Sequence, residues 1–561
     1  MSLANQVPLS PLTFLARARR AFPGKVAVVD GDGTEVSYET LGRDGDAMAG
    51  ALRAGGIRPG DRVAMLDLNS RWLLAAHYGV PGSGAALVAL NSRLAAPEYR
   101  DILAHSRARV LLVSPALLPA LAVSSAGDLP VETVVLLPGG EDPARPAGQD
   151  AALPGALSYE EWLARAGSRG MESPGDEDAM IAVNYTSGTT GRPKGVVYTH
   201  RGAYLNAVSV ALEFGLSSSS WHLWTLPMFH CNGWSLTWGV TTVGGTHVCL
   251  PSFDADRALD LTAQYPVTHL CGAPVVLSEL ARAGSRRGFV AARPVRAAVG
   301  GAPPTKETIA AVQQMGVQVT HLYGLTETYG PSLVCEYQEG WTELPAAVLA
   351  ERISRQGVPT VSVADVRVAD VRVADGSLAP VPADGKTVGE ILVRSNTVAA
   401  GYLDDEQATA EAFRGGWFHT GDLAVTHPDG YVELTDRSKD VIISGGENIA
   451  SVEVEKVLAA HPQVLEAAVV AVPDVRWGER PVAFVTTSGG AVTERELTEF
   501  VRGRLAHFKA PDRVYFETLP KTSTGKIQKH VLRAVARERT SDGDPAPARS
   551  PGTTGSPDAA A

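Results

Sequence analysis

Along the first 180 residues, stretches with apolar residues at helical spacing alternate with short runs of consecutive apolar residues. The amphipathic stretch 39–54 is followed by the apolar run 62–66, and the stretch 97–105 is followed by the run 109–113. Helices that alternate with short buried strands are typical of a mostly parallel sheet covered by helices. We therefore predict an α/β fold for this large N-terminal part.

The pattern changes near residue 435. Beyond this point, the helical patterns 452–460 and 494–505 alternate with the strand patterns 467–472 and 481–487. These four elements predict a compact α+β domain of about a hundred residues, which is a normal domain size. From residue 540 onward the chain consists mainly of Ser, Asp, Gly, Pro and Ala without apolar periodicity, so we expect a disordered tail over 540–561.

Composition excludes several classes of protein. The net charge is −11 and basic residues form no dense stripe, which argues against nucleic-acid binding. No apolar stretch reaches membrane-spanning length, and we find neither a signal peptide nor a C-terminal peroxisomal address. The four cysteines lack metal-site spacing and are predicted to be reduced core residues. We therefore expect a cytoplasmic protein.

A polar loop at 185–195 carries the clearest chemical signal. It reads Tyr-Thr-Ser-Gly-Thr-Thr-Gly-Arg-Pro-Lys-Gly and lies between the apolar runs 180–183 and 196–200, which we predict to be strands. Glycines let the backbone approach an anion, hydroxyls donate to phosphate oxygens, and the lysine adds positive charge. A plain polar hairpin does not explain Pro-Lys-Gly directly after the glycines, and the spacing excludes a Walker loop. We predict a nucleoside triphosphate site.

This loop resembles the signature of the AMP-binding, or acyl-adenylate-forming, superfamily, and further motifs extend the resemblance over about residues 10–538. That superfamily includes acyl-CoA synthetases, aryl-CoA ligases, firefly-type luciferases and amino-acid adenylation domains. The resemblance implies that the phosphates of ATP bind to Thr186, Ser187, Gly188, Thr189, Thr190, Gly191 and Lys194.

Two motifs resemble the family's adenine and phosphate elements. The run Gly300-Gly301-Ala302-Pro303 corresponds to a turn that flanks the adenine, although by itself it would be an ordinary strand-to-helix turn. The run 323–328 resembles the family's Tyr-Gly-x-Thr-Glu motif. The resemblance assigns purine stacking to Tyr323 beside Gly324, an α-phosphate contact to Thr326, and Mg²⁺ binding to Glu327.

The later motifs imply a mobile C-terminal part. By resemblance, Asp422 accepts the ribose hydroxyls, Arg437 contacts ribose or phosphate, Lys439 is the hinge residue, Gly445 and Gly446 line the pantetheine channel, and Lys526 contacts the α-phosphate and the substrate oxyanion. The expected organisation is an N-terminal domain over 1–435, a hinge over 436–439, a small mobile α+β domain over 440–539 and the tail.

The segment 226–234 resembles part of the acyl pocket of short- and medium-chain acid–CoA ligases. There His230 would lie at the pocket floor near the carboxylate, whereas without the family it would be a packed core histidine. Amino-acid adenylation domains have an aspartate in this segment and this chain has none, which argues against an α-amino acid substrate.

The resemblance implies an ATP-dependent carboxylate–CoA ligase that forms an acyl-AMP, releases pyrophosphate and then releases AMP. Its expected co-substrates are ATP and coenzyme A, its metal is Mg²⁺, and its partner is a small carboxylic acid; a homodimer is compatible with the sequence. An enzyme that adenylates nitrite and forms a diazo group from an aryl amine would carry the same nucleotide motifs. A non-catalytic regulator is disfavoured by the presence of Lys526 and Glu327, and luciferase activity would require a special pocket.

Overall fold

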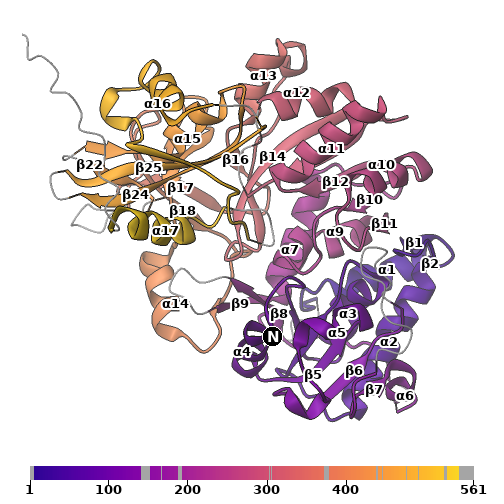
Figure 1. Cartoon of the computed structure of the whole chain (residues 1–561). Coiled ribbons are helices and arrows are strands. Elements are labelled where there is room, and N and C mark those ends of the chain that lie inside the picture. Colours follow the sequence, from indigo (N-terminus) through magenta and orange to yellow (C-terminus); the bar gives the residue numbers. More distant parts are fainter. Residues whose placement is uncertain are drawn as a thin grey trace, which may run out of the picture. The chain divides into compact units, whose positions relative to one another are not determined.

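The chain divides into two compact units (Figure 1). Residues 1–420 and 424–434 pack together as the first unit, and residues 421–423 and 435–561 pack together as the second. The computed structural model describes residues 5–139, 152–165, 167, 169–186, 193–301, 304, 306–371, 378–437, 440–444, 447–474, 477–489, 492–522 and 527–541.

One sheet of the first unit has eight described strands, and its central neighbours run parallel. Its order is β19 (Gly401–Tyr402), β9 (Lys194–Thr199), β8 (Met180–Thr186), β4 (Ala86–Ala89), β3 (Arg62–Leu66), β5 (Ala108–Val113), β6 (Thr133–Leu136) and β7 (Leu157–Ser158). Only β8, β9 and β19 pair with each other in antiparallel fashion.

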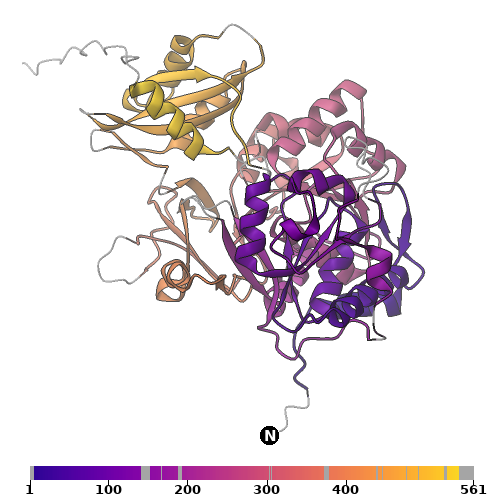
Figure 2. The ribbon, with the colours of Figure 1, turned by 60° about the horizontal axis from the view of Figure 1, so that its bottom comes forward.

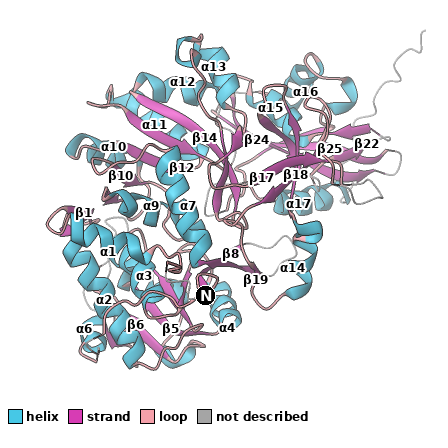
Figure 3. Cartoon of the chain, turned by 180° about the vertical axis from the view of Figure 1, so that it is seen from behind, coloured by secondary structure: helices cyan, strands magenta, loops and turns pink. Residues whose placement is uncertain are grey.

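Both faces of this sheet are buried. Alternate residues of β3 enter different cores, with Val63 and Met65 on one side and Ala64 and Leu66 on the other. Figure 3 shows helices around these strands. A different group of helices contributes to the core on each face of the sheet. The first group is α1 (Leu12–Ala21), α2 (Tyr38–Ala54) and α3 (Arg71–Gly82), and the second is α4 (Ala96–Ser106) and α5 (Leu118–Leu121). Burial on both faces explains the continuous apolar runs of the sequence.

A second sheet of the first unit has nine described strands. Its order is β16 (Val358–Pro359), β15 (Gly330–Val334), β14 (Val317–Leu325), β13 (Val295–Val299), β12 (His269–Gly272), β10 (Trp221–Trp224), β11 (Thr246–Cys249), β1 (Val26–Val29) and β2 (Glu35–Ser37). The core that contains Val63 of the other sheet also contains Ala298 of β13, so the two sheets share it. The opposite face is covered by α10 (Ala255–Gln264), α11 (Pro274–Arg287) and α12 (Lys306–Gln314).

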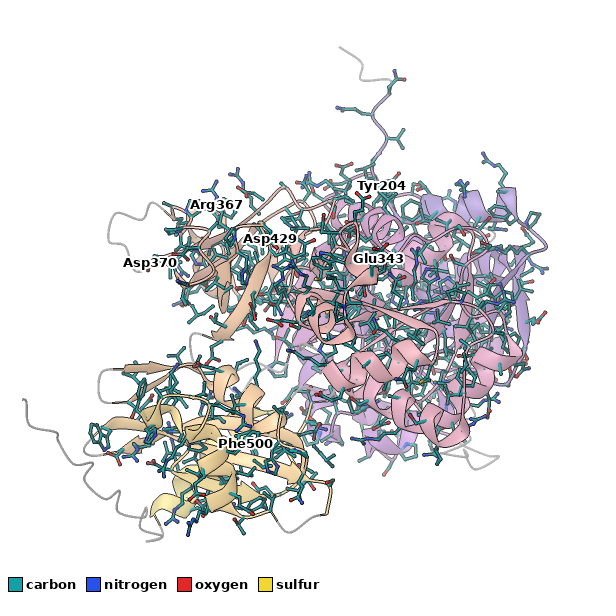
Figure 4. All side chains as sticks on the ribbon, turned by 90° about the horizontal axis from the view of Figure 1, so that it is seen from above. Tyr204, Glu343, Arg367, Asp370, Asp429 and Phe500 are labelled. Carbon is teal, nitrogen blue, oxygen red and sulfur yellow. The ribbon has the colours of Figure 1, made fainter. Side chains whose placement is uncertain are left out.

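Helix α7 (His200–Glu213) follows β9 without a linker. The Thr199 hydroxyl accepts a hydrogen bond from the Gly202 amide and caps the helix, so His200 begins the helix and does not continue the strand as the sequence suggested. The Tyr204 ring, labelled in Figure 4, stacks on Phe14 of α1 with 4.6 Å between ring centroids. The helix α7 also packs on α9 (Leu236–Val243), so it is buried among elements of both sheets.

The remaining described elements of the first unit are short. They include the sheet β17 (Asp365–Ala369), β18 (Gly389–Arg394), β20 (Phe418–Thr426) and β21 (Val432–Arg437), in which β20 and β21 also contain residues of the second unit. The other helices are α6 (Tyr159–Leu163), α8 (Cys231–Trp234), α13 (Ala346–Ile353) and α14 (Glu406–Ala412).

The second unit is an α+β sandwich. Its sheet comprises β23 (Glu447–Ile449), β22 (Ile442–Ser444), β25 (Gly478–Thr487), β24 (Val464–Asp474) and β26 (Arg513–Phe516). Helices α15 (Ser451–Ala459) and α16 (Glu494–Arg502) contribute to the core on one face, while α17 (Lys529–Ser541) packs on the other face (Figure 2). The predicted fold class, a large α/β part with mostly parallel sheets and a smaller α+β part, is confirmed.

Two predictions from composition can also be compared with the structure. All four cysteines, Cys231, Cys249, Cys271 and Cys335, are buried and free. Within the described ranges, no helix is long and apolar enough to cross a membrane.

Candidate active site

The predicted triphosphate loop connects β8 and β9, two antiparallel strands in which Thr186 lies opposite Lys194. Strands flank the loop as the sequence indicated. Its residues Ser187, Gly188, Thr189, Thr190 and Gly191 lie outside the described residues. Thr186 and Lys194, the described residues at the two ends of the loop, therefore lie side by side where β8 ends and β9 begins.

A chain of contacts at this end of the strand pair joins Lys194 to Tyr402 and Tyr402 to Glu327. The Lys194 ammonium lies 4.7 Å from the centroid of the Tyr402 ring, a cation–π arrangement. The Tyr402 hydroxyl donates to the Glu327 carboxylate at 2.9 Å. Burial, and secondarily the Glu327 charge, raises the pKa of Tyr402 well above its ordinary value, so this hydroxyl stays protonated and remains a donor. Two predicted ligands, Lys194 and Glu327, are thus brought together by a third residue.

Thr326 and Glu327 belong to a tight turn, Thr326–Gly330, which we call the phosphate turn. The Tyr198 hydroxyl of β9 donates to the Thr326 carbonyl at 2.8 Å, and its ring stacks on Tyr329 at 3.6 Å between centroids. Tyr329 and Gly330 both have positive φ. A Cβ on Gly324 would lie 1.9 Å from the Gly330 carbonyl oxygen, so only glycine fits at position 324.

The segment Cys231–Ser235, which we call the acyl turn, has an unusual backbone. All five residues have positive φ, between 42° and 61°, although only one of them is glycine. Left-handed conformations cost L-residues roughly 1–2 kcal/mol each, so neighbouring contacts must hold this turn in place. The short segment α8 is therefore a left-handed turn and not a regular α-helix.

Buried amides supply part of that support. The Asn184 amide donates to the Phe229 carbonyl at 2.6 Å, and the Asn206 amide donates to the Ser235 hydroxyl at 3.0 Å. The Asn232 amide lies 2.9 Å from Nε2 of His77, whose Nδ1 lies 2.7 Å from the Leu73 carbonyl. Burial lowers the pKa of His77 to about 4, so at neutral pH the ring is uncharged and Nε2 accepts from Asn232.

The acyl turn touches the phosphate turn at Thr326. The Cys231 thiol donates to the Thr326 hydroxyl at 3.7 Å, and the half-buried His230 ring has Nε2 3.9 Å from the same sulfur. Burial raises the pKa of Cys231 to about 12, so the thiol is neutral and cannot act as a nucleophile at neutral pH. Because the Thr326 oxygen accepts from sulfur, its own proton is available for a third group. The predicted residues His230 and Thr326 therefore lie in one cluster.

The predicted adenine elements lie beside this cluster. Gly300 follows β13, and a Cβ there would lie 3.0 Å from the Trp234 ring of the acyl turn. Gly301 has a φ of +88°, whereas Ala302 and Pro303 lie outside the described residues. Tyr323 is largely buried in β14 and packs with Leu333 of β15. The structure thus joins Gly300 to the acyl turn through the indole of Trp234.

Several predicted residues are not placed in this cluster. Asp422 is buried in β20, and Arg437 ends β21. Four others lie outside the described residues: Lys439, Gly445, Gly446 and Lys526.

Among the described residues, no group of three or more His, Cys, Asp or Glu side chains is placed so that it could hold a metal ion. Mg²⁺ that arrives with ATP needs only one or two carboxylates, since phosphate oxygens and water complete its shell. Glu327 offers one such carboxylate. Tyr402 is its one hydrogen-bond partner among the described side chains, through one of the two oxygens. Glu327 therefore fits a metal that is carried by the nucleotide.

Several residues of this cluster could not be predicted from the sequence. These residues lie in apolar or ordinary segments: Tyr198, Tyr402, Cys231 and Asn206. Cys231 and Tyr198 both contact Thr326, which is more than 90 residues away from either of them in the sequence. An asparagine in the middle of a helix is the one available signal, because asparagine is a poor helix former.

The chain is similar to known proteins over most of its length. Residues 15–403 match the AMP-binding enzyme family and residues 453–526 match the AMP-binding enzyme C-terminal domain. The chain is 42% identical to a peroxisomal acetate/butyrate–CoA ligase of Arabidopsis thaliana, over 95% of this chain and 96% of the relative. It is also 42% identical to an acetate–CoA ligase of Humulus lupulus with the same coverage. The solved structure of an anthranilate CoA ligase with anthranoyl-AMP is 25% identical and has a TM-score of 0.81, over 96% of this chain and 100% of that one.

Proposed function

The chain belongs to the AMP-binding enzyme family and is an AMP-forming acid–CoA ligase, and we propose that its acid is a short-chain aliphatic carboxylate. The observation that carries the proposal is the contact between the acyl turn and the phosphate turn at Thr326. This contact supports the proposal because it would bring the wall proposed for the acid next to a hydroxyl and a carboxylate that suit phosphate and Mg²⁺. The proposed reaction joins the acid to AMP and then to coenzyme A.

In the first half-reaction, a carboxylate oxygen of the acid attacks the α-phosphorus of ATP and pyrophosphate leaves. Catalysis of such a transfer rests on positioning and on neutralising the phosphate charge. We assign the α-phosphate to the Thr326 hydroxyl, which the Cys231 thiol leaves free to donate its proton. Lys194 and the loop that begins at Thr186 would bind the other phosphates.

Glu327 would hold Mg²⁺ against the phosphate oxygens, and the metal would supply positive charge there. The Tyr402 hydroxyl fixes the carboxylate, and Lys194 lies over the Tyr402 ring. This arrangement keeps the Lys194 cation close to Glu327 without a direct ion pair, so the positive charge stays available to the nucleotide. Tyr323 and Gly300 would flank the adenine, and Asp422 and Arg437 would bind the ribose.

In the second half-reaction, the thiol of coenzyme A attacks the acyl carbon and AMP leaves. We propose that Lys526 serves the first half-reaction and that the predicted mobile domain, from residue 440 onward, then rotates about Lys439. The rotation would replace Lys526 by the channel residues Gly445 and Gly446. Such alternation also keeps water from the reactive acyl-AMP.

The choice of a short-chain acid rests on the acyl turn and on the two named relatives. Trp234 is 7% exposed and a Cβ on Gly300 would lie 3.0 Å from its indole, while Phe229 is 6% exposed and belongs to the same core. Large rings in this wall favour a small acyl group. The relatives that are 42% identical are named for acetate and butyrate, whereas the anthranilate ligase is 25% identical.

The cytoplasmic location and a homodimer stay predictions. The four free, buried cysteines support a reducing compartment. Fluorescence of a tagged chain and size-exclusion chromatography with light scattering would test the two predictions separately.

The proposed function is tested by incubating the full chain with ATP, Mg²⁺ and a panel of acids, with and without coenzyme A. The panel contains acetate, propanoate, butyrate, 2-methylpropanoate, hexanoate and benzoate, and products are identified by mass spectrometry. We expect an acyl-CoA only when coenzyme A is present, with the highest kcat/KM for an acid of two to four carbons. Lys526→Ala is the control and should lose acyl-CoA formation.

The panel also separates the alternatives. A preference for benzoate would retain the ligase and contradict the short-chain proposal. If no acid gave an acyl-AMP or acyl-CoA, while nitrite with an aryl amine consumed ATP, the ligase itself would be contradicted.

A further inference from the structure

Asn206 occupies the middle of α7 and is completely buried. Both hydrogens of its amide are used, one toward the Ser235 hydroxyl at 3.0 Å and one toward the Tyr329 carbonyl at 2.6 Å. Ser235 ends the acyl turn and Tyr329 belongs to the phosphate turn. A single amide therefore bridges the wall expected to receive the acid and the turn expected to receive phosphate and Mg²⁺.

Neither turn is stable by local preference. The acyl turn has five consecutive residues with positive φ, and the phosphate turn has two, Tyr329 and Gly330. The turns also meet directly, because a Cβ on Gly330 would lie 3.2 Å from the Trp234 Cα. Backbone in sparsely populated conformations persists only when surrounding contacts determine it. The contacts that join the two turns thus set their relative position.

Other groups near the turns form weaker bridges or none. Tyr198 donates to the Thr326 carbonyl and stacks on the Tyr329 ring, and its contact with the acyl turn is to the Cys231 thiol, a weak hydrogen-bonding group. Asn184 reaches the Phe229 carbonyl, which precedes the acyl turn. The thiol of Cys231 does link the turns, but a thiol is a weak donor and its distance to Thr326 is 3.7 Å. The Asn206 amide is the strong polar link among the described side chains.

We propose that Asn206 is a positioning residue that couples the acyl turn to the phosphate turn, so that the acid seated in the pocket sets the placement of Thr326 and Glu327. The inference rests on the proposed function. An acid that fills the pocket would press on the acyl turn, and the amide would transmit this position to the phosphate turn. Different acids would then differ in kcat for adenylation as well as in the KM for the acid.

The test compares Asn206→Ala with Asn184→Ala in the full-length chain. Each variant loses one buried amide next to the acid wall, but only Asn206 contacts the phosphate turn. ATP–pyrophosphate exchange is measured with the best acid and the next shorter acid, together with the KM for ATP and the melting temperature. We expect Asn206→Ala to lower kcat with the best acid about tenfold or more, since small displacements of reacting groups are costly.

The decisive quantity is the ratio of kcat values for the two acids. We expect it to fall toward one in Asn206→Ala and to stay at the wild-type value in Asn184→Ala, whose main change should be a higher KM for the acid. A residue with a merely structural role would lower the melting temperature and leave the ratio unchanged. Equal ratios in wild type, Asn206→Ala and Asn184→Ala would overturn the proposal.

Ser235→Ala keeps the test valid if Asn206→Ala does not fold. It removes only the acyl-turn partner of the amide, at a position where alanine loses one hydroxyl. We expect the same fall in the kcat ratio, with a smaller loss of kcat; an unchanged ratio would contradict the coupling. Wild-type chain that showed no exchange with any acid would refute the proposed function, whereas active wild type with uncoupled variants would refute this inference alone.

Discussion

The two turns of the active site in the first unit are held by neutral groups, whereas the base of α17 in the second unit is held by charged groups. Around the turns, the donors are the Asn184, Asn206 and Asn232 amides and the Tyr198 hydroxyl. In the second unit, the buried Asp436 carboxylate accepts from the Ser451 backbone amide and hydroxyl, and Lys529 of α17 contacts both Ser451 and Glu455. Arg533, one helical turn further, pairs with Asp440.

The difference follows from what each region must do. The candidate active site is proposed to receive a carboxylate and a triphosphate, so an acidic side chain in its frame would repel substrate and a basic one would pair with Glu327. Neutral hydrogen bonds fix geometry without changing the local charge. The charged frame instead ties α17, which follows the Lys526 motif, to Asp440 and Glu455 beyond the predicted hinge and, through Ser451, to Asp436 within it. Removing one partner of a buried pair leaves an uncompensated charge, so this frame is strong only when complete.

The largest effect is expected for Glu327→Gln. This substitution removes the negative charge of the phosphate turn, which neutral hydrogen-bonding groups surround. We expect pyrophosphate release to fall about a hundred- to thousandfold, because the carboxylate for Mg²⁺ is lost. Release is measured at saturating ATP and Mg²⁺. Glu343→Gln is the control, since Glu343 is exposed on the surface of the first unit (Figure 4) and should behave as wild type. Activity of Glu327→Gln near that of the control would exclude the assigned role.

Lys529→Met breaks the charged frame. Burial raises the pKa of Glu455 and the nearby Lys529 ammonium opposes that rise, so removal of the lysine leaves the buried Glu455 carboxylate without its paired cation. We expect the unfolding free energy of the second unit to fall by about 3 kcal/mol. The unfolding free energy of the second unit is measured by denaturant titration, with limited proteolysis as the probe of its unfolding.

Lys509→Met is the matched comparison, because Lys509 pairs with Glu453 on the same helix α15 but in a more exposed position. Exposed pairs contribute about 1 kcal/mol or less. Equal destabilisation by the two substitutions would show that the frame around Ser451 has no special role.

Tyr198→Phe tests the neutral frame with a minimal change. It removes the hydroxyl that donates to the Thr326 carbonyl and keeps the ring that stacks on Tyr329. A net contribution of about 1 kcal/mol per hydrogen bond predicts a loss of about fivefold in kcat for adenylation. Because no charge is removed, the loss should be the same at low and high ionic strength. A salt-dependent effect would contradict the neutral character of the frame.

A pH dependence provides the smallest expected effect. The pKa of His77 in the folded chain is lowered by burial to about 4, below its unfolded value of about 6.5, so folding favours the neutral ring. The corresponding stability is fully present above pH 6.5 and is lost as the pH falls toward 4. His77→Gln cannot titrate, so between pH 7.5 and pH 5 its melting temperature should fall less than that of wild type.

Other buried groups titrate in both chains and cancel in this comparison. Burial lowers the pKa of His200 to about 4 and raises the pKa of Asp67 to about 7, and the two shifts act in opposite directions as the pH falls. If the melting temperatures of wild type and His77→Gln fell equally between pH 7.5 and pH 5, His77 would not be held neutral by folding.

The sequence predicted those parts of the molecule that depend on local pattern. The apolar runs 62–66 and 109–113 are β3 and β5, buried on both faces. The motif residues Lys194 and Glu327 both contact Tyr402, and Thr326 precedes Glu327 in the phosphate turn, while the roles that the resemblance gave them stay predictions. The helix predicted over 494–505 ends at Arg502, because Gly503 has low helix propensity.

The remaining features depend on contacts that no local pattern encodes. The two partners of Asn206 lie 29 and 123 residues away in the chain. The left-handed acyl turn contains a single glycine, so its residues give no sign of positive φ, and the turn forms only because buried amides and the phosphate turn surround it. Such a turn is set by tertiary structure, which a reading of spacing cannot reproduce.

The central claim, acid activation through an acyl-AMP, is tested most directly by isotope transfer. Butyrate labelled with ¹⁸O in both carboxylate oxygens is incubated with the full chain, ATP, Mg²⁺ and coenzyme A, and the nucleotide product is analysed by mass spectrometry. Attack of the carboxylate on the α-phosphorus predicts AMP that carries one labelled oxygen, together with butyryl-CoA. Unlabelled AMP, or ADP with labelled phosphate, would contradict the account.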